Sequence, residues 1–236
     1  MDRDLLRTRL QETRTRIASA AIRYGRPADS VGLVAISKSQ PAEALRALAE
    51  MGQRDFGENY LQEAMPKLTA LADRDLIWHF TGQLQSNKTR TVAEHFAWVH
   101  TLDRERIALR LHEQRPHHSP VLNVCIQVRL VDEPGKGGVP PEETFALASR
   151  IRELPRLKLR GLMCIPPPSH TFEAQRAWFE RLAECAHELS SRGFDLDTLS
   201  MGMSDDLEAA IAAGATWVRI GTALFGPRRS SDPLNP

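Results

Sequence analysis

Short apolar runs alternate with longer amphipathic segments along most of the chain. Many of the runs lack the strict alternation of polar and apolar residues that a half-exposed strand shows, which indicates strands buried on both faces. Such strands, separated by helical segments, are typical of a parallel sheet. The predicted strands cover residues 33–37, 55–57, 77–82, 98–101, 121–128, 159–165, 198–201 and 217–220.

The segments outside these runs have the spacing of amphipathic helices. The first, residues 4–23, precedes every predicted strand, carries Leu6 and Leu10 on one side, and ends before Gly25 and Pro27. Eight strands separated by helices predict the α/β class and a single (β/α)8 TIM barrel with an extra N-terminal helix. The other predicted helices cover residues 42–51, 59–70, 104–111, 142–154, 172–190 and 205–213.

Length and composition agree with one large core. The chain has 236 residues, 42% hydrophobic and 26% charged, within the range of ordinary globular proteins. No shift in composition marks a second domain. We therefore expect one barrel domain over residues 1–229 and a flexible tail over residues 230–236.

The charge balance and the termini exclude several classes of partner. Lysine and arginine number 31 against 30 for aspartate and glutamate, so no overall field favours nucleic acid or an anionic membrane. The first residues are charged, and no apolar run approaches the ~20 residues that span a bilayer. Residues 135–138 (GKGG) lack the P-loop and dinucleotide fingerprints, so we expect a flexible turn there.

The three cysteines are Cys125, Cys164 and Cys185, widely spaced and set in apolar runs. This arrangement favours free, buried thiols over a disulfide framework or a metal site. We expect a soluble cytoplasmic protein without a metal.

Lys38 stands at the end of the first predicted strand. In a closed barrel this strand adjoins the eighth, so Lys38 should lie roughly 5–10 Å from the mouths of the last two strands. A lysine that is partly desolvated there has a lowered pKa and becomes a nucleophile toward aldehydes. The alternative is an ordinary solvated lysine at a strand end.

Two turns that contain glycine follow the seventh and eighth predicted strands, where barrels frequently bind phosphate. Gly202 allows close approach of the backbone, Ser204 offers a hydroxyl, and Gly221 and Thr222 open a final helical turn with unpaired amides. The alternative for Ser204 is a simple N-cap of the helix that follows it.

Three further polar residues lie in or after predicted strands. An inward Arg219 is costly unless it is paired or touches a ligand, so it either pairs with an acid such as Glu58 or donates to a ligand's ring nitrogen. Asn59 and His79 hydrogen-bond either a ligand or a partner in the barrel wall. We interpret His79 as a residue behind the ligand.

Together these motifs resemble the family of pyridoxal phosphate homeostasis proteins, which is similar to the barrel domain of alanine racemase. The resemblance extends from about residue 4 to residue 227. The motifs that carry it are VAISK at 34–38, FGENY at 56–60, WHF at 78–80, GLM at 161–163, SMGMSDD at 200–206 and VRIGT at 218–222.

The resemblance implies that Lys38 carries pyridoxal 5′-phosphate (PLP) as an internal aldimine, and that Ser204, Gly221 and Thr222 hold its phosphate. It also implies that Arg219 faces the pyridine nitrogen, where a cation disfavours protonation and weakens the cofactor as an electron sink. None of the predicted site residues is assigned a catalytic role. The predicted cofactor-binding residues are Lys38, Asn59, His79, Met203, Ser204, Arg219, Gly221 and Thr222.

The function that the resemblance implies is intracellular handling of PLP and other B6 vitamers, including transfer to client enzymes, without substantial turnover. Racemases of the similar fold use a further β domain that supplies a second acid or base, often a tyrosine. This chain ends just past the last barrel strand and contains only Tyr24 and Tyr60. Because the racemases dimerise through that further domain, we expect a monomer.

Two alternatives stay open. One is a slow amino-acid racemase or related PLP enzyme that uses Lys38 as its single base. The other is a barrel that binds another sugar or nucleotide phosphate and leaves Lys38 unmodified.

Overall fold

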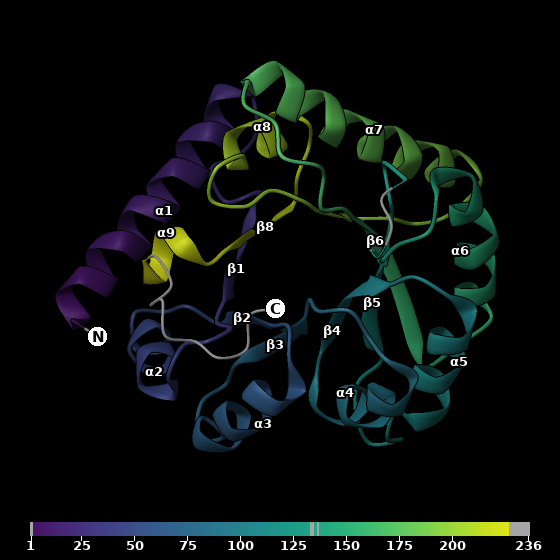
Figure 1. Cartoon of the computed structure of the whole chain (residues 1–236), viewed down its shortest axis with the longest axis horizontal. Coiled ribbons are helices and arrows are strands. Elements are labelled where there is room, and N and C mark those ends of the chain that lie inside the picture. Colours follow the sequence, from purple (N-terminus) through teal and green to yellow (C-terminus); the bar gives the residue numbers. More distant parts are fainter. Residues whose placement is uncertain (1, 133–134, 136, 227–236) are drawn as a thin grey trace.

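Eight parallel strands close into a barrel in the order of the sequence (Figure 1). The computed structural model describes residues 2–132, 135 and 137–226, so Lys136 and the predicted tail at 230–236 lie outside the described residues. The predicted (β/α)8 barrel is confirmed. The strands are β1 (Gly32–Ile36), β2 (Asp55–Glu58), β3 (Ile77–Phe80), β4 (Trp98–Leu102), β5 (Leu122–Gln127), β6 (Leu157–Met163), β7 (Thr198–Ser200) and β8 (Trp217–Ile220).

Helices follow the strands and form the outer layer (Figure 1). They bury their apolar sides against the sheet, and the main core lies between the two layers. In the part of the chain that the structure describes, no helix has the length and apolar character needed to cross a bilayer. The helices are α1 (Arg3–Arg23), α2 (Ala42–Glu50), α3 (Leu61–Ala70), α4 (Thr89–His95), α5 (Glu105–Gln114), α6 (Thr144–Arg152), α7 (Phe172–Ser191), α8 (Leu207–Ala212) and α9 (Thr222–Phe225), with short 3₁₀ turns at Ser86–Lys88 and Pro141–Glu143.

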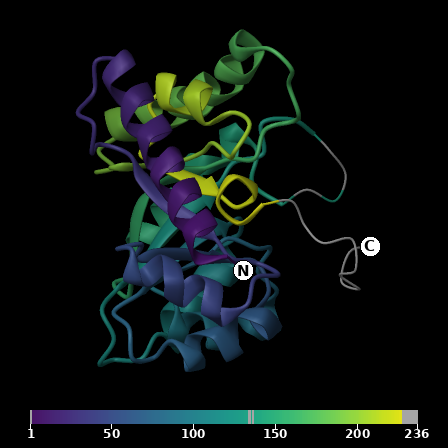
Figure 2. The same ribbon diagram turned by 90° about the vertical axis from the view of Figure 1, so that its left-hand side faces the viewer.

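The extra helix α1 covers the outside of the barrel where β1 and β8 meet (Figure 2). The Asp2 side chain caps it by accepting a hydrogen bond from the Asp4 amide, and its apolar side is buried against α2, α8 and α9. The predicted extra N-terminal helix is therefore confirmed.

Two helical segments differ from the predictions. Helix α4 was not predicted, because its seven residues include only two buried apolar side chains, Val92 and Ala93, too few to show a period. The predicted helix at 142–154 is divided into a 3₁₀ turn at Pro141–Glu143 and α6, which begins at Thr144.

Strand β1 pairs with β8 in a register that aligns Val34 with Arg219 and Ala35 with Ile220. The two strands approach closely at their start, where a Cβ on Gly32 would lie 2.5 Å from the indole of Trp217. The same register brings the residues that follow the two strands to one face of the barrel.

Candidate functional site

Lys38 lies at the carboxyl face of the barrel, two residues after the end of β1. The preceding residue, Ser37, is buried and bonds to the next strand: its amide donates to the Gly57 carbonyl at 2.9 Å and its hydroxyl to Glu58 Oε1 at 2.6 Å. Lys38 itself is half-buried. The backbone that presents Lys38 is thus anchored to β2.

A second lysine, Lys67 on α3, is buried directly behind this anchor. Its ammonium donates to the Ser37 carbonyl at 2.6 Å and to Glu58 Oε1 at 2.8 Å. Burial raises the pKa of Glu58, and the charge of Lys67 opposes that rise. The sequence reasoning missed Lys67, although its helical spacing from Leu61 and Ala64 places all three on the buried side of α3.

Ser204, in the turn after β7, points toward the turn after β8. Its hydroxyl accepts a hydrogen bond from the Ala223 amide, in the first turn of α9, at 3.2 Å. The N-cap interpretation of Ser204 is wrong, because α8 begins at Leu207 and Asp206 occupies the N-cap position. Burial raises the pKa of Asp206. Its carboxylate accepts a hydrogen bond from the Met203 amide at 2.6 Å, within the turn that follows β7.

Gly202 gives the turn after β7 its shape. Its φ of +97° lies in the region that favours glycine, and a Cβ there would lie 2.6 Å from the Cβ of Ala210. The Gly202 carbonyl accepts from the Arg219 amide at 2.9 Å. The turn after β7 is therefore bonded to β8 through this backbone contact and to the first turn of α9 through the Ser204 side chain.

Gly221 brings the turn after β8 next to the end of β1. A Cβ on Gly221 would lie 3.4 Å from the Ile36 carbonyl oxygen, and Ile36 stands two residues before Lys38. The structure therefore brings Lys38, Gly221, Thr222 and Ser204 together at one face, which agrees with the placement expected from a closed barrel.

Arg219 is only 5% exposed and points into the barrel. It donates to the hydroxyl of Ser200 and to the carbonyl oxygen of Cys164, both at 2.9 Å. The expected alternative of a salt bridge with Glu58 is wrong, because Glu58 is bonded to Lys67 and Ser37. Burial lowers the pKa of Arg219, yet arginine keeps its charge in proteins, so a cation lies inside the barrel with two neutral acceptors.

The remaining predicted site residues are more dispersed. Asn59 Oδ1 accepts from the Thr81 hydroxyl at 2.8 Å, and both residues line a cavity of about 270 Å³ at the carboxyl ends of β2 to β6. Met203 is 41% exposed in the turn after β7. His79 is fully buried inside the barrel and bonds to His100 and Asp55.

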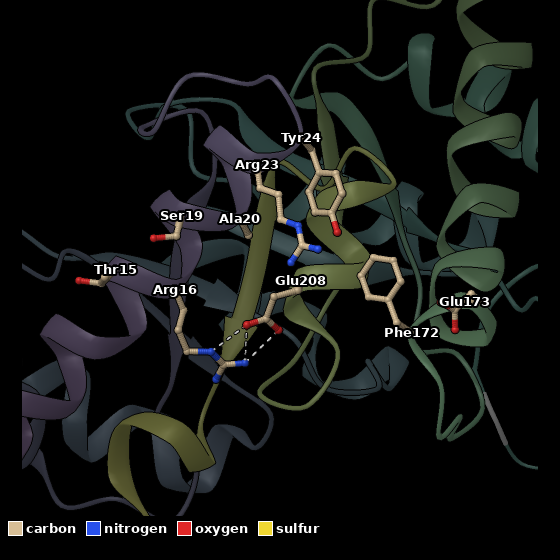
Figure 3. Close-up of a pocket in the computed structure, with 9 residues that line it drawn as sticks. All are labelled: Thr15, Arg16, Ser19, Ala20, Arg23, Tyr24, Phe172, Glu173 and Glu208. Carbon is tan, nitrogen blue, oxygen red and sulfur yellow. Dashed lines mark hydrogen bonds and ion pairs between the residues drawn. The ribbon is translucent and has the colours of Figure 1, made fainter.

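A surface cavity of about 680 Å³ lies outside the barrel between α1, α7 and α8 (Figure 3). Its lining includes Tyr24, whose ring stacks on Phe172 with centroids 6.3 Å apart. Arg16 on α1 pairs with Glu208 there (Figure 3). Arg16 also donates to the Ser204 carbonyl at 3.2 Å. Because none of the predicted site residues lines this cavity, the candidate site is the barrel mouth instead.

The cysteines agree with the predicted free thiols. Cys125 and Cys164 are buried and Cys185 is half-buried. Burial raises the pKa of both Cys125 and Cys164 to about 12. Among the described residues, no group of three or more histidine, cysteine or acidic side chains could hold a metal ion.

Comparison with known proteins places this geometry in a family. The model of the alanine racemase N-terminal domain matches residues 11–229. The chain is 57% identical to the pyridoxal phosphate homeostasis protein of Pseudomonas aeruginosa over 220 residues, which cover 93% of this chain and 94% of that protein. It is 50% identical to the protein of the same name from Escherichia coli K12 over 222 residues, which cover 93% and 95%.

Solved structures agree with this. PipY of Synechococcus elongatus, solved with PLP bound, is 40% identical, has a TM-score of 0.78, and is matched over 89% of this chain and 100% of its own. Alanine racemase of Clostridium difficile has a TM-score of 0.70 at 14% identity, over 97% of this chain and 58% of its own, which shows a shared fold. The chain therefore belongs to the family of pyridoxal phosphate homeostasis proteins, built on the alanine racemase N-terminal domain.

Proposed function

We propose that this protein binds PLP covalently through Lys38 and handles the cofactor for other enzymes, without substantial turnover of its own. The observation that carries the proposal is the pairing of β1 with β8, which puts Lys38 beside the turn at Gly221. The relatives named for PLP homeostasis, and PipY with PLP bound, support the same ligand.

The residues at the barrel mouth fit a phosphorylated pyridine aldehyde. When bound, PLP supplies an aldehyde that condenses with a lysine amine and releases water. The Ser204 hydroxyl and the amides of the first turn of α9 suit its phosphate, since amides at a helix start lack partners within the helix. Gly221 keeps this turn free of a side chain on the side of β1.

Arg219 is the group that favours binding over turnover. We assign it to the ring nitrogen, where a fixed cation donates a hydrogen bond and opposes protonation. Of the two tyrosines, Tyr24 stacks on Phe172 outside the barrel and Tyr60 is 51% exposed at the start of α3. The position of neither tyrosine supports a role as a second acid or base buried opposite Lys38.

The test is reduction of the PLP-loaded protein with borohydride, followed by mass analysis of its peptides. We expect the label on Lys38 and its loss in Lys38→Ala, which should keep a weaker, phosphate-dependent affinity through Ser204 and the turn at Gly221. Lys88→Ala is the matched control, because Lys88 is also half-buried and ends the 3₁₀ turn that follows β3.

A label on Lys88 in the wild-type protein, or an unlabelled protein after soaking in PLP, would contradict the assignment. Exchange of the α-hydrogen of alanine, well above the rate with free PLP, would favour the racemase alternative. Transfer to client enzymes, a monomeric state and a cytoplasmic location remain predictions from the sequence.

A further inference from the structure

A chain of four hydrogen bonds crosses the inside of the barrel and ends on Arg219. Asp55 Oδ1 lies 2.9 Å from His79 Nε2, and His79 Nδ1 lies 2.8 Å from His100 Nε2. His100 Nδ1 lies 2.7 Å from Ser200 Oγ, which accepts from Arg219 at 2.9 Å. Since β4 and β7 are not neighbours in the barrel, the bond between His100 and Ser200 passes through its interior.

The far end of this chain is a carboxylate at the opposite face of the barrel from Lys38. Asp55 opens β2, and its side chain is 19% exposed, whereas His79, His100 and Ser200 are fully buried. Trp98 and Trp217 flank the His79 ring, with centroids 5.5 and 5.4 Å away. These hydrogen bonds thus join a carboxylate and a guanidinium through three buried side chains.

The protons of this chain can be assigned from its two ends. Asp55, as a carboxylate, only accepts, so His79 must carry its proton on Nε2. His79 Nδ1 is then an acceptor, which requires the His100 proton on Nε2. His100 Nδ1 in turn accepts the hydroxyl hydrogen of Ser200, whose lone pairs are left to face Arg219.

Burial keeps both imidazoles neutral, as this assignment requires. Burial lowers the pKa of His79, and the nearby carboxylate of Asp55 only partly opposes it. Burial also lowers the pKa of His100, and the charge of Arg219 adds to the effect. Every donor in the chain therefore points from Arg219 toward Asp55.

We propose that Asp55, His79, His100 and Ser200 are positioning residues that hold the Arg219 guanidinium in place for the ring nitrogen of PLP. The carboxylate sets the tautomer of both histidines, and His100 holds the Ser200 hydrogen away from Arg219. Without that acceptor the hydroxyl would be free to rotate, and Arg219 would lose a fixed partner. This inference rests on the proposed function of Arg219.

Asp55→Asn tests the inference at the residue farthest from the ligand. An amide can donate or accept, so the variant keeps a hydrogen bond to His79 but no longer sets its direction. Asp75→Asn is the matched control, because Asp75 precedes β3 at the same end of the barrel and pairs with Arg54. Asp75 takes no part in the series of hydrogen bonds from Asp55 to Arg219. Asp75→Asn removes the same charge.

The first measurement uses the protein without PLP and records imidazole nitrogen signals by NMR. We expect His79 and His100 as neutral Nε2–H tautomers in the wild type and in Asp75→Asn, and mixed tautomers in Asp55→Asn. Nδ1–H tautomers in the wild type would overturn the inference, whether or not PLP binds.

The second measurement follows the absorbance of the PLP-loaded protein against pH, together with the rate of PLP release. Asp55→Asn should release PLP about 5-fold faster or more and shift the pH midpoint of the absorbance change. Loss of the outer hydrogen-bond partner of a metal ligand likewise weakens metal binding, by about 10-fold or more. Asp75→Asn should stay within about 2-fold of the wild type. Equal behaviour of the two variants would overturn the positioning role, whereas failure of the wild type to bind PLP would overturn the proposed function beneath it.

Discussion

At the scale of single residues, Lys67 supports the backbone that presents Lys38. Lys67 neutralises the buried Glu58 and holds the carbonyl of Ser37, next to Lys38. Glu58 Oε2 is itself buried without a hydrogen-bond partner among the described residues. Loss of the Lys67 ammonium would leave the buried Glu58 carboxylate without this opposite charge.

Lys67→Met should therefore lower the free energy of unfolding by about 3–5 kcal/mol, the range for removing one partner of a buried ion pair. Urea unfolding followed by circular dichroism measures this change. The double variant Lys67→Met with Glu58→Gln should recover part of the loss, because the uncompensated charge is gone. Lys158→Met, at an exposed lysine of β6, is the control, and an equal effect there would contradict the interpretation.

At the scale of elements, the turn after β7 depends on the absence of a side chain at Gly202. Gly202→Ala should lower stability by about 2–4 kcal/mol, because it adds overpacking against Ala210 to the cost of a positive φ. Gly193→Ala measures the cost of the positive φ alone, because Gly193 has a φ of +84° and nothing lies within 4 Å of its Cβ position. This substitution should lower stability by about 1–2 kcal/mol. Thermal unfolding of both variants measures the difference in their losses of stability. Equal losses would show that Ala210 shifts enough to accommodate the new Cβ.

Helix α1 connects to the same turn through Arg16, which donates to the Ser204 carbonyl. Arg16 also pairs with Glu208 on α8 (Figure 3). The pair is about 40% exposed on both sides, so Arg16→Ala should change stability by less than ~1 kcal/mol. We expect a clearer effect on PLP affinity, because the turn that carries Ser204 loses a fixed contact.

Equilibrium titration with PLP measures this effect, and the dissociation constant should rise about 3-fold or more. Arg7→Ala is the control on the same helix, because Arg7 pairs with Asp4 one turn away on α1 itself. If both variants bind PLP as the wild type does, α1 has no part in the site.

At the scale of the whole molecule, the buried histidines make stability depend on pH. An unfolded histidine takes up its proton near pH 6.5, and burial lowers the pKa of His79 and His100 in the folded protein. Below about pH 6.5 the unfolded chain therefore binds more protons than the folded one, and the free energy of unfolding decreases as the pH is lowered. Glu58, whose folded pKa is raised, acts in the opposite direction at lower pH.

Urea unfolding between about pH 7.5 and about pH 5.5 should show this loss, at up to about 1.4 kcal/mol per pH unit for each histidine. His100→Gln should reduce the slope by about 1 kcal/mol per pH unit, whereas His118→Gln, at an exposed histidine, should leave it unchanged. Identical slopes for wild type and His100→Gln would mean that His100 is protonated in the folded barrel.

The order of strands and helices could be predicted from the sequence because it depends on local patterns. Buried parallel strands appear as unbroken apolar runs, and each predicted strand lies within a few residues of an observed one. The turn glycines and Lys38 follow those runs directly, so their common face follows once the barrel closes.

Partners could not be predicted in the same way. Ser204 bonds Ala223 across 19 residues, and His100 bonds Ser200 across 100, so neither pair leaves a local signal. Local patterns were enough to predict the fold class and the residues at the strand ends. The pairing of Lys67 with Glu58 and the neutral acceptors of Arg219 depend instead on barrel closure, because a buried polar group bonds to whatever partner the closed barrel brings within reach.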